Sequence, residues 1–342
     1  MSFLSGLLGK TRGEAVALID VGAASVAGAI VLFVDAEPPT IIHERRLPIE
    51  IQEGEAHERA MLRALDVLGA ALVREGIPAL QRAGSGGRLS STLLAIDAPW
   101  LATDVHHEYI GDPKGFTFTK RLVDATVAKV ATVAADKVLT DTSVLHITLN
   151  GYETADPYGK RVNNATILIL TSIMAKELER QVLLTIGNQL RTKTAIIAGS
   201  SMRYQAMRVA FPHESDLIIA DVTGPEAVVA LVRRGVLTGV AETVSITALS
   251  KADDAIHKIT ELAKTCPLPR TIFILARDAE YDDVKKALET MDVARMCFSN
   301  SIPKVVPVLA SHLAPRVRQL TTAPPDLPIF LMALYRAQSE LD

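Results

Sequence analysis

Two apolar segments of the chain, about 200 residues apart, end in the same way. Residues 17–22 read ALIDVG and residues 217–224 read LIIADVTG, so each apolar run closes on an aspartate, Asp20 or Asp221, followed by small residues. A second apolar run follows each of them. Short apolar runs rich in β-branched residues predict buried strands. Any fold of this chain must therefore accommodate two strand–turn–strand units with an acid at each turn.

The rest of the sequence alternates between strand and helix patterns. Strands are predicted over residues 16–19, 26–34, 92–96, 144–149, 165–170, 194–198, 216–222, 226–232, 236–247 and 271–276. Apolar periodicity predicts helices over residues 57–80, 121–137, 175–190, 250–264, 281–291 and 329–340. A hairpin turn is predicted at Arg233-Arg234-Gly235. Strands that alternate with helices predict an α/β protein whose sheets are covered by helices.

The bulk composition excludes several classes of protein. With 342 residues, 49% of them hydrophobic, the chain can form one large or two ordinary domains. A formal net charge of −3 gives no electrostatic reason to expect a nucleic acid partner, and basic pairs such as Arg45-Arg46 are interpreted as solvated. The two cysteines, Cys266 and Cys297, lack the spacing of a zinc site or a disulfide framework, which fits a reducing cytoplasm.

The mean hydropathy of +0.24 requires a test for membrane contact. The most apolar window, residues 16–34, contains Asp20 and many Gly, Ala and β-branched residues, so two strands explain it better than a spanning helix. Within residues 1–10, four apolar side chains share one helical face, namely Phe3, Leu4, Leu7 and Leu8. This segment is consistent with a peripheral membrane contact or with a docked N-terminus.

The chemistry best served by the two turns is the binding of nucleotide phosphates. Glycine lets the backbone approach phosphate oxygens, turn amides attract anions, and Ser or Thr hydroxyls add donors. A carboxylate at a strand end can hold Mg²⁺, which prefers oxygen ligands, so Asp20 and Asp221 are the predicted metal ligands. The predicted nucleotide-binding residues are Asp20, Gly22, Ala23, Ser25, Asp221, Thr223 and Gly224.

The pair of turns resembles the two phosphate turns of the actin and sugar-kinase superfamily. The segment 149–162, LNGYETADPYGKRV, is similar to a stretch of the bacterial FtsA and PilM proteins that lies in an inserted subdomain of the SHS2 type. The resemblance covers nearly the whole chain. It implies an α/β, actin-like (ribonuclease H-like) two-domain fold with residues 1–87 and 175–212 in the first domain, residues 88–174 as the inserted SHS2-like subdomain, and residues 213–342 in the second domain.

The sequence departs from the family pattern at two places. Gly224 is followed by Pro225, which has no N–H, and by Glu226, which would repel phosphate. The late strand 271–276, after which nucleotide-binding members have a glycine-rich turn, continues into residues 277–280 without a glycine. ATP and Mg²⁺ are therefore the implied cofactors, with their binding expected to be either weakened or lost.

The resemblance implies a cytoplasmic assembly or scaffold protein at the inner face of the cytoplasmic membrane. It would link a cell-division or type IV pilus machine to cytoplasmic partners. The implied partner is the tail peptide of an inner-membrane protein or another division or pilus component, and self-association stays open. No catalytic residue is identified, so any ATPase activity is expected to be weak. Two alternatives stay open: a nucleotide-free pseudo-ATPase that binds proteins, and a small-molecule kinase of the same superfamily.

Other motifs carry little weight. His106-His107-Glu108 could suggest a metal site, but adjacent residues of an extended segment point to opposite faces, so a polar strand or loop is favoured. The sequence also lacks the GxSxG, HExxH and GxxxxGK[ST] motifs of hydrolases, zinc proteases and P-loop proteins.

Overall fold

The computed structural model describes residues 13–84, 86–154, 156–224, 227–242, 250–264, 267–276, 281–290 and 304–338. The chain divides into two compact units. The first unit is built from residues 1–96, 180–210 and 309–342, and the second from residues 97–179 and 211–308. The segment 1–10, interpreted as a peripheral membrane contact or a docked N-terminus, lies outside the described residues.

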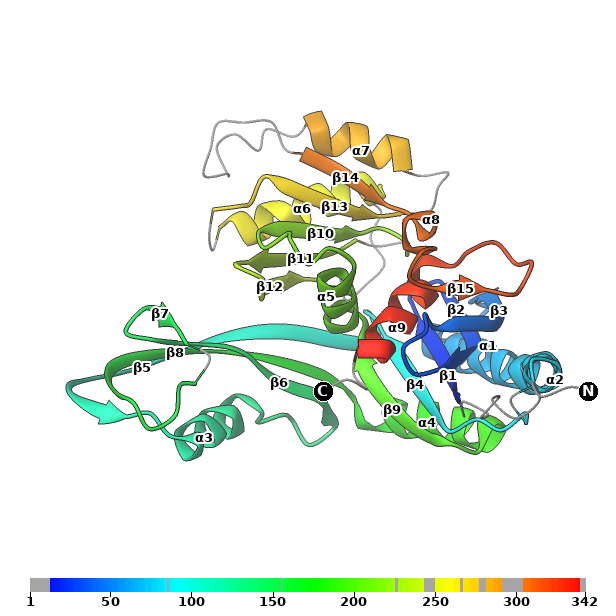
Figure 1. Cartoon of the computed structure of the whole chain (residues 1–342), viewed down its shortest axis with the longest axis horizontal. Helices are drawn as coiled ribbons and strands as arrows, with labels where there is room; N and C mark the ends of the chain where they lie inside the picture. The colour runs from blue at the N-terminus through cyan, green and yellow to red at the C-terminus, as the bar shows by residue number, and fades with distance from the viewer. Residues whose placement is uncertain are drawn as a thin grey trace, which may run out of the picture. The chain divides into compact units, whose positions relative to one another are not determined.

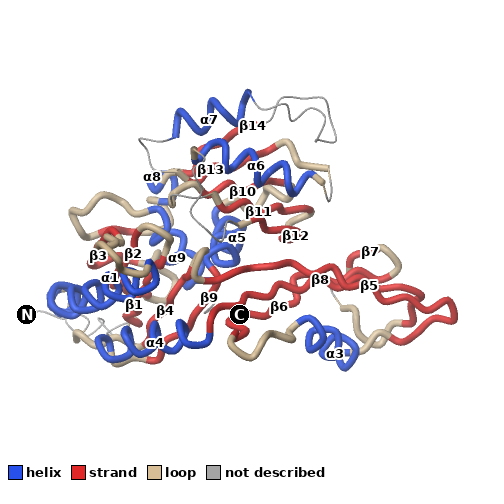
Figure 2. The backbone as a smooth tube through the Cα atoms, turned by 180° about the vertical axis from the view of Figure 1, so that it is seen from behind, coloured by secondary structure: helices blue, strands red, loops and turns tan. Residues whose placement is uncertain are grey.

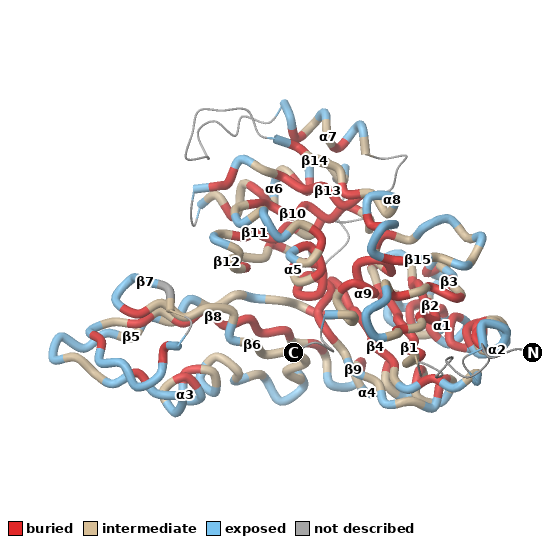
Figure 3. Tube along the Cα trace, in the orientation of Figure 1, coloured by how far each residue is buried: buried red, intermediate tan, exposed pale blue. Residues whose placement is uncertain are grey.

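The first unit contains a six-stranded sheet with the order β15-β3-β2-β1-β4-β9. Its strands are β1 (Glu14–Val21), β2 (Ser25–Phe33), β3 (Thr40–Pro48), β4 (Ser91–Ile96), β9 (Lys193–Ala198) and β15 (Arg318–Gln319). β1 pairs antiparallel with β2 and parallel with β4 (Figure 1). Seven of the eight residues of β1 are buried, which places this strand in the centre of the core (Figure 3). The predicted strands 16–19, 26–34, 92–96 and 194–198 are confirmed.

Helical segments complete the first unit: α1 (His57–Ala71), the π-helical turn η1 (Leu72–Gly76), α2 (Ile77–Arg82), α4 (Lys176–Leu190, which begins in the second unit), α5 (Gly199–Ala210), α8 (Ala310–Leu313) and α9 (Leu327–Gln338). The predicted helices 57–80 and 175–190 are confirmed. Gly76 allows η1 to approach the sheet, because a Cβ there would lie 2.9 Å from Cγ1 of Ile30. α5 was not predicted, since nine of its twelve residues are buried and its sequence shows no apolar stripe.

The second unit contains a five-stranded sheet with the order β12-β11-β10-β13-β14. Its strands are β10 (Leu217–Asp221), β11 (Val228–Arg233), β12 (Val236–Ala241), β13 (Thr271–Leu275) and β14 (Lys304–Val308). β10 pairs antiparallel with β11 and parallel with β13, as β1 does with β2 and β4. The strands β3-β2-β1-β4-β9 of the first sheet and the strands β12-β11-β10-β13-β14 of the second thus share one order, and β15 is an additional edge strand of the first. The predicted hairpin turn is confirmed, with positive φ angles at Arg234 and Gly235.

The helices α6 (Lys251–Ala263) and α7 (Tyr281–Thr290) contribute buried apolar side chains to the core of this five-stranded sheet. The predicted helices 250–264 and 281–291 are confirmed: α6 is one residue shorter than predicted at each end, α7 begins at the predicted residue, and residue 291 lies outside the described residues.

A separate four-stranded sheet, with the order β5-β8-β6-β7, is formed by residues between β4 and α4. It consists of β5 (Leu101–Thr117), β6 (Lys137–Leu149), β7 (Tyr152–Glu153) and β8 (Arg161–Ala175). The helix α3 (Lys120–Val130) lies beside this sheet (Figure 2). Apolar side chains of α3, such as Val123, form a buried cluster with side chains of the sheet. The prediction of one helix over residues 121–137 is wrong at its end. β6 begins at Lys137, which pairs with Ala175 of β8, so this long-range pairing overrides the local helical pattern.

None of the helices in the described part of the chain is long and apolar enough to cross a membrane.

Candidate functional site

The two predicted turns occupy equivalent positions in the two sheets. Asp20 is the penultimate residue of β1 and Asp221 is the last residue of β10, and both carboxylates are buried. In each sheet the acid lies beside an antiparallel strand on one side and a parallel strand on the other. The two turns therefore correspond in their position within the sheets as well as in their sequence.

Contacts to main-chain atoms connect the first turn to neighbouring segments. Three of these contacts are the hydrogen bond from Gly22 N to Ser25 O (3.0 Å), the hydrogen bond from Ile49 N to Ala24 O (2.8 Å), and the contact between His57 Nε2 and Ala23 O (2.8 Å). They tie the turn to the end of β3 and to the start of α1. Asp20, Gly22, Ala23 and Ser25 are thus brought together, as the sequence predicts.

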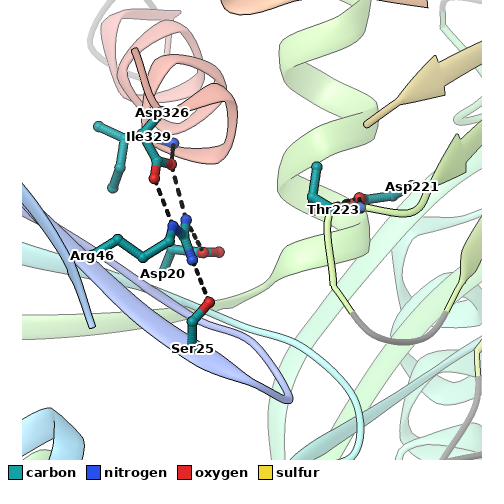
Figure 4. Close-up of polar contacts among 7 residues, drawn as sticks. All are labelled: Asp20, Ser25, Arg46, Asp221, Thr223, Asp326 and Ile329. Atoms are coloured by element: carbon teal, nitrogen blue, oxygen red, sulfur yellow. Dashed lines mark hydrogen bonds and ion pairs between the residues drawn. The ribbon is translucent and has the colours of Figure 1, made fainter. Parts of the chain in front are cut away.

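The side chain of Arg46, on β3, reaches the carboxylate of this turn. Arg46 lies opposite Ala27 of β2, and Ala27 lies opposite Asp20 of β1, so the three residues form one row across three strands. Directly opposed residues point to the same face of a sheet, and the small side chain of Ala27 leaves room for the arginine. Arg46 Nη2 donates to Asp20 Oδ2 at 2.9 Å, and Arg46 Nη1 donates to Ser25 Oγ at 2.8 Å (Figure 4).

The same guanidinium holds a third acceptor, Asp326. Arg46 Nε donates to Asp326 Oδ2 at 2.6 Å and Arg46 Nη2 donates to Asp326 Oδ1 at 2.9 Å, which is a bidentate pair. Asp326 directly precedes α9, and its carboxylate accepts a hydrogen bond from the N–H of Ile329 at 3.2 Å. Asp326 therefore caps the helix and binds the arginine with one side chain (Figure 4).

The electrostatics of this cluster keep Arg46 charged. Burial alone would lower the pKa of Arg46, but the hydrogen bonds and opposite charges of Asp326 and Asp20 outweigh burial and raise the pKa. Glu44 lies two residues before Arg46 on the same face of β3. Burial and the negative charge of Asp326 raise the pKa of Glu44 to about 7, although a hydrogen bond from Gln319 to Glu44 partly offsets them.

The interpretation of Arg45-Arg46 as a solvated pair is wrong for one of its members. Arg45 is exposed and pairs with Glu75, whereas Arg46 points to the opposite face and enters the cluster. Residues adjacent on a strand alternate between faces, so assigning β3 from the sequence would have revealed this difference. No local signal identifies Asp326, which is 280 residues away from Arg46 in the chain.

The second turn is closed by its own side chains. The backbone N–H and the hydroxyl of Thr223 both donate to Asp221 Oδ1, at 2.9 and 2.6 Å. Gly224 is the last described residue of this turn, and both Pro225 and Glu226 lie outside the described residues. Residues 277–280, where the sequence lacks the late glycine turn, also lie outside them.

The residues of the first turn do not fit a metal ion in this conformation. Mg²⁺ requires close oxygen ligands in near-octahedral geometry. Oδ2 of Asp20 and the hydroxyl of Ser25 both accept hydrogen bonds from a guanidinium that stays charged, and this cation would repel a divalent ion placed at the same oxygens. The metal and nucleotide roles of Asp20 and Asp221 remain predictions.

The histidine pair does not form a metal site in the described residues. His106 Nε2 contacts Thr171 Oγ1 at 2.8 Å, and His107 Nε2 contacts the carbonyl oxygen of Thr238 at 2.9 Å. Among the described residues, no group of three His, Cys, Asp or Glu side chains is placed to hold a metal ion. The two histidines therefore serve different contacts, as the alternation of side chains along a strand predicts.

No protein-family model matches the sequence, and the search of curated proteins found no match. The fold does match solved structures. One is the PilM-PilN type IV pilus biogenesis complex, with a TM-score of 0.56 and 14% identity, over 97% of this chain and 99% of that chain. A Bacteroides thetaiotaomicron protein described as having an actin-like ATPase fold and unknown function has a TM-score of 0.48 and 9% identity, over 96% of this chain and 97% of that chain.

The cytoplasmic domain of EpsL, an inner-membrane component of the type II secretion system of Vibrio cholerae, gives a TM-score of 0.42 and 10% identity over 95% of both chains. Sequence identities this low give evidence of the fold alone. The fold assignment rests on the first of these structures, which this chain matches over nearly its whole length. Together with the repeated strand order of the two sheets, it shows that this chain has an actin-like α/β fold.

Proposed function

We propose that this protein is an actin-fold assembly factor at the inner face of the cytoplasmic membrane. It links a membrane machine, a type IV pilus or a division septum, to cytoplasmic partners, and its own partner is the cytoplasmic tail of an inner-membrane protein. The observation that carries the proposal is the match over 97% of the chain to the structure of a pilus biogenesis complex. Because one fold hosts many functions, the partner itself has to be tested directly.

The four-stranded sheet is the proposed partner-binding part, in keeping with the predicted inserted subdomain 88–174. Among the described residues, β6 pairs with β8 along one edge, while its other edge pairs only with β7, at residues 148–149. An unpaired strand edge can accept an extended peptide as an additional strand. Two tyrosines on this sheet, Tyr109 and Tyr152, have 70% and 78% of their surface exposed. Tyrosine is enriched among the residues that dominate binding energy at interfaces.

Site-specific photocrosslinking in cells of the source organism tests this proposal. A photoreactive amino acid is placed at Tyr109 or Tyr152, and at Val67 as a matched control, because Val67 is 52% exposed on α1 of the other unit. We expect the two sheet positions to crosslink to an inner-membrane protein through its cytoplasmic tail, and the control position to give no such product. Equal crosslinking from all three positions, or products with cytoplasmic proteins alone, would contradict the proposed role.

A further inference from the structure

We propose that Asp20, Ser25 and Asp326 form a cation site whose resident occupant is the guanidinium of Arg46, and that this occupant closes the first turn to a metal–nucleotide group. The inference rests on the contacts within the first unit and does not depend on the membrane role proposed above. It explains why a turn with the residues of a phosphate site can be retained in a chain whose other nucleotide motifs depart from the family pattern.

The shape of the site matches an arginine rather than a metal ion. The guanidinium uses Nε, Nη1 and Nη2 to make four hydrogen bonds, with lengths of 2.6, 2.8, 2.9 and 2.9 Å, to the three acceptor residues. A planar fork of donors fits two carboxylates and a hydroxyl arranged in this way, whereas a spherical ion needs its oxygens at equal and shorter distances. The bidentate pair with Asp326 fixes the orientation of the fork.

The occupant is held permanently near its site. Arg46 lies in the same row of the sheet as Asp20, separated from it only by Ala27, and the ladder between β2 and β3 fixes this register. A tethered group competes at a high effective concentration with any ligand that arrives from solution. A free Mg²⁺ ion would have to displace the guanidinium from Asp20 and would then lie beside the released charge.

An anion without a metal is disfavoured for a second reason. The two carboxylates of Asp20 and Asp326 carry two negative charges against the single positive charge of Arg46, so the cluster has no surplus cation to offer a phosphate. The side chains of Asp20 and Asp326 are only 5% and 15% exposed, so solvent weakly screens their repulsion of a phosphate placed at the turn. Neither half of a Mg-nucleotide is therefore favoured here.

The same contacts give the site a structural task. Arg46 joins the turn after β1 to the residue that caps α9, and these groups come from opposite ends of the sequence. In this arrangement the conformation of the first turn is set by the chain itself. No ligand is needed to connect the turn to the C-terminal helix.

The decisive experiment compares the wild-type protein with Asp20→Asn in calorimetric titrations with Mg-ATP and in Mn²⁺ titrations followed by electron paramagnetic resonance. We expect the wild type to show no saturable binding of Mg-ATP or Mn²⁺ that is lost in Asp20→Asn. Binding to the wild type that falls on the order of tenfold or more in Asp20→Asn would overturn the proposal. Binding that the substitution leaves unchanged would belong to other groups and would leave the first turn closed, as proposed.

A second experiment removes the occupant. Arg46→Ala leaves the acceptors without their cation, so we expect its melting temperature to fall and then to rise again when low millimolar guanidinium is added. The wild type with guanidinium, and both proteins with equal sodium chloride, are the controls.

We also expect Arg46→Ala to bind Mn²⁺, and the added substitution Asp20→Asn to abolish that binding. If guanidinium lowers the melting temperature of both proteins alike, the site is not a guanidinium site. Should Arg46→Ala fail to fold, the comparison of the wild type with Asp20→Asn decides the question alone.

Discussion

The side chain of Asp326 performs two tasks that one substitution can separate. It accepts two hydrogen bonds from Arg46, and it caps α9 through the N–H of Ile329. Asparagine is also a good residue at a helix N-terminus, so Asp326→Asn preserves the cap while it removes the charge. Asp326→Ala removes both. The difference between the two variants therefore isolates the ion pair from the cap.

The expected magnitude follows from the geometry of the pair. Hydrogen bonds to charged groups each contribute about 1.5–3 kcal/mol to stability, and asparagine can still accept one of the two. The side chains of Arg46 and Asp326 are 25% and 15% exposed, so solvent screens this pair less than it screens an exposed one. We expect Asp326→Asn to destabilise the attachment of α9 by about 2 kcal/mol, which corresponds to a roughly 30-fold larger opening equilibrium. Loss of the cap in Asp326→Ala adds about 1 kcal/mol.

Hydrogen exchange followed by mass spectrometry measures this local opening. Peptides covering α9 should lose protection in Asp326→Asn, while peptides covering β13, in the other unit, should exchange as in the wild type. In a background that already carries Arg46→Met, the same substitution should have little further effect, because the interaction is already lost. Equal exchange of α9 in Asp326→Asn and the wild type would refute the reasoning. So would an equal acceleration at β13, which would indicate a global effect.

Three further predictions follow from other parts of the structure. Because the folded-state pKa of Glu44 is raised from 4.5 to about 7, stability should fall as the pH rises from about 4.5 to about 7, and urea unfolding of Glu44→Gln should lack this slope. Gly76→Ala should cost about 1–3 kcal/mol, since its Cβ would meet Ile30, whereas Gly187→Ala, in open space within α4, should gain up to about 1 kcal/mol in the same assay. Asn150→Ala should speed hydrogen exchange in β8, because the Asn150 side chain accepts from two backbone amides of that strand at 2.9 and 3.1 Å.

The parts of the fold that depend on local sequence could be predicted. β1 and β10 are apolar runs closed by an acid and small residues, and these local features alone indicate both the strands and their turns. Helices whose apolar residues recur regularly on one face, such as α1, could also be predicted from the local sequence. The two predicted turns consequently lie where the pattern placed them.

The occupant of the first turn could not be predicted, because it depends on register between strands. β3 contains four polar residues in succession, His43, Glu44, Arg45 and Arg46, so its sequence lacks the apolar pattern from which a strand is predicted. The position of Arg46 opposite Ala27 follows from sheet pairing that no local window contains. The contact with Asp326 further requires the start of α9 to lie beside β3, although the two are 280 residues apart in the sequence.

The two ends of the segment that forms the four-stranded sheet lie next to each other. Leu101, near its beginning, pairs with Met174, near its end, so the two connections to the rest of the protein lie on adjacent strands. A segment attached by neighbouring ends can be lengthened, shortened or exchanged without altering the order of the strands on either side of it, because the span that it must bridge stays the same. The proposed partner-binding sheet can therefore differ in length and sequence between related chains while the strand order of the other two sheets stays the same, provided that its contacts with the region of β12, such as that of His107 with Thr238, are kept.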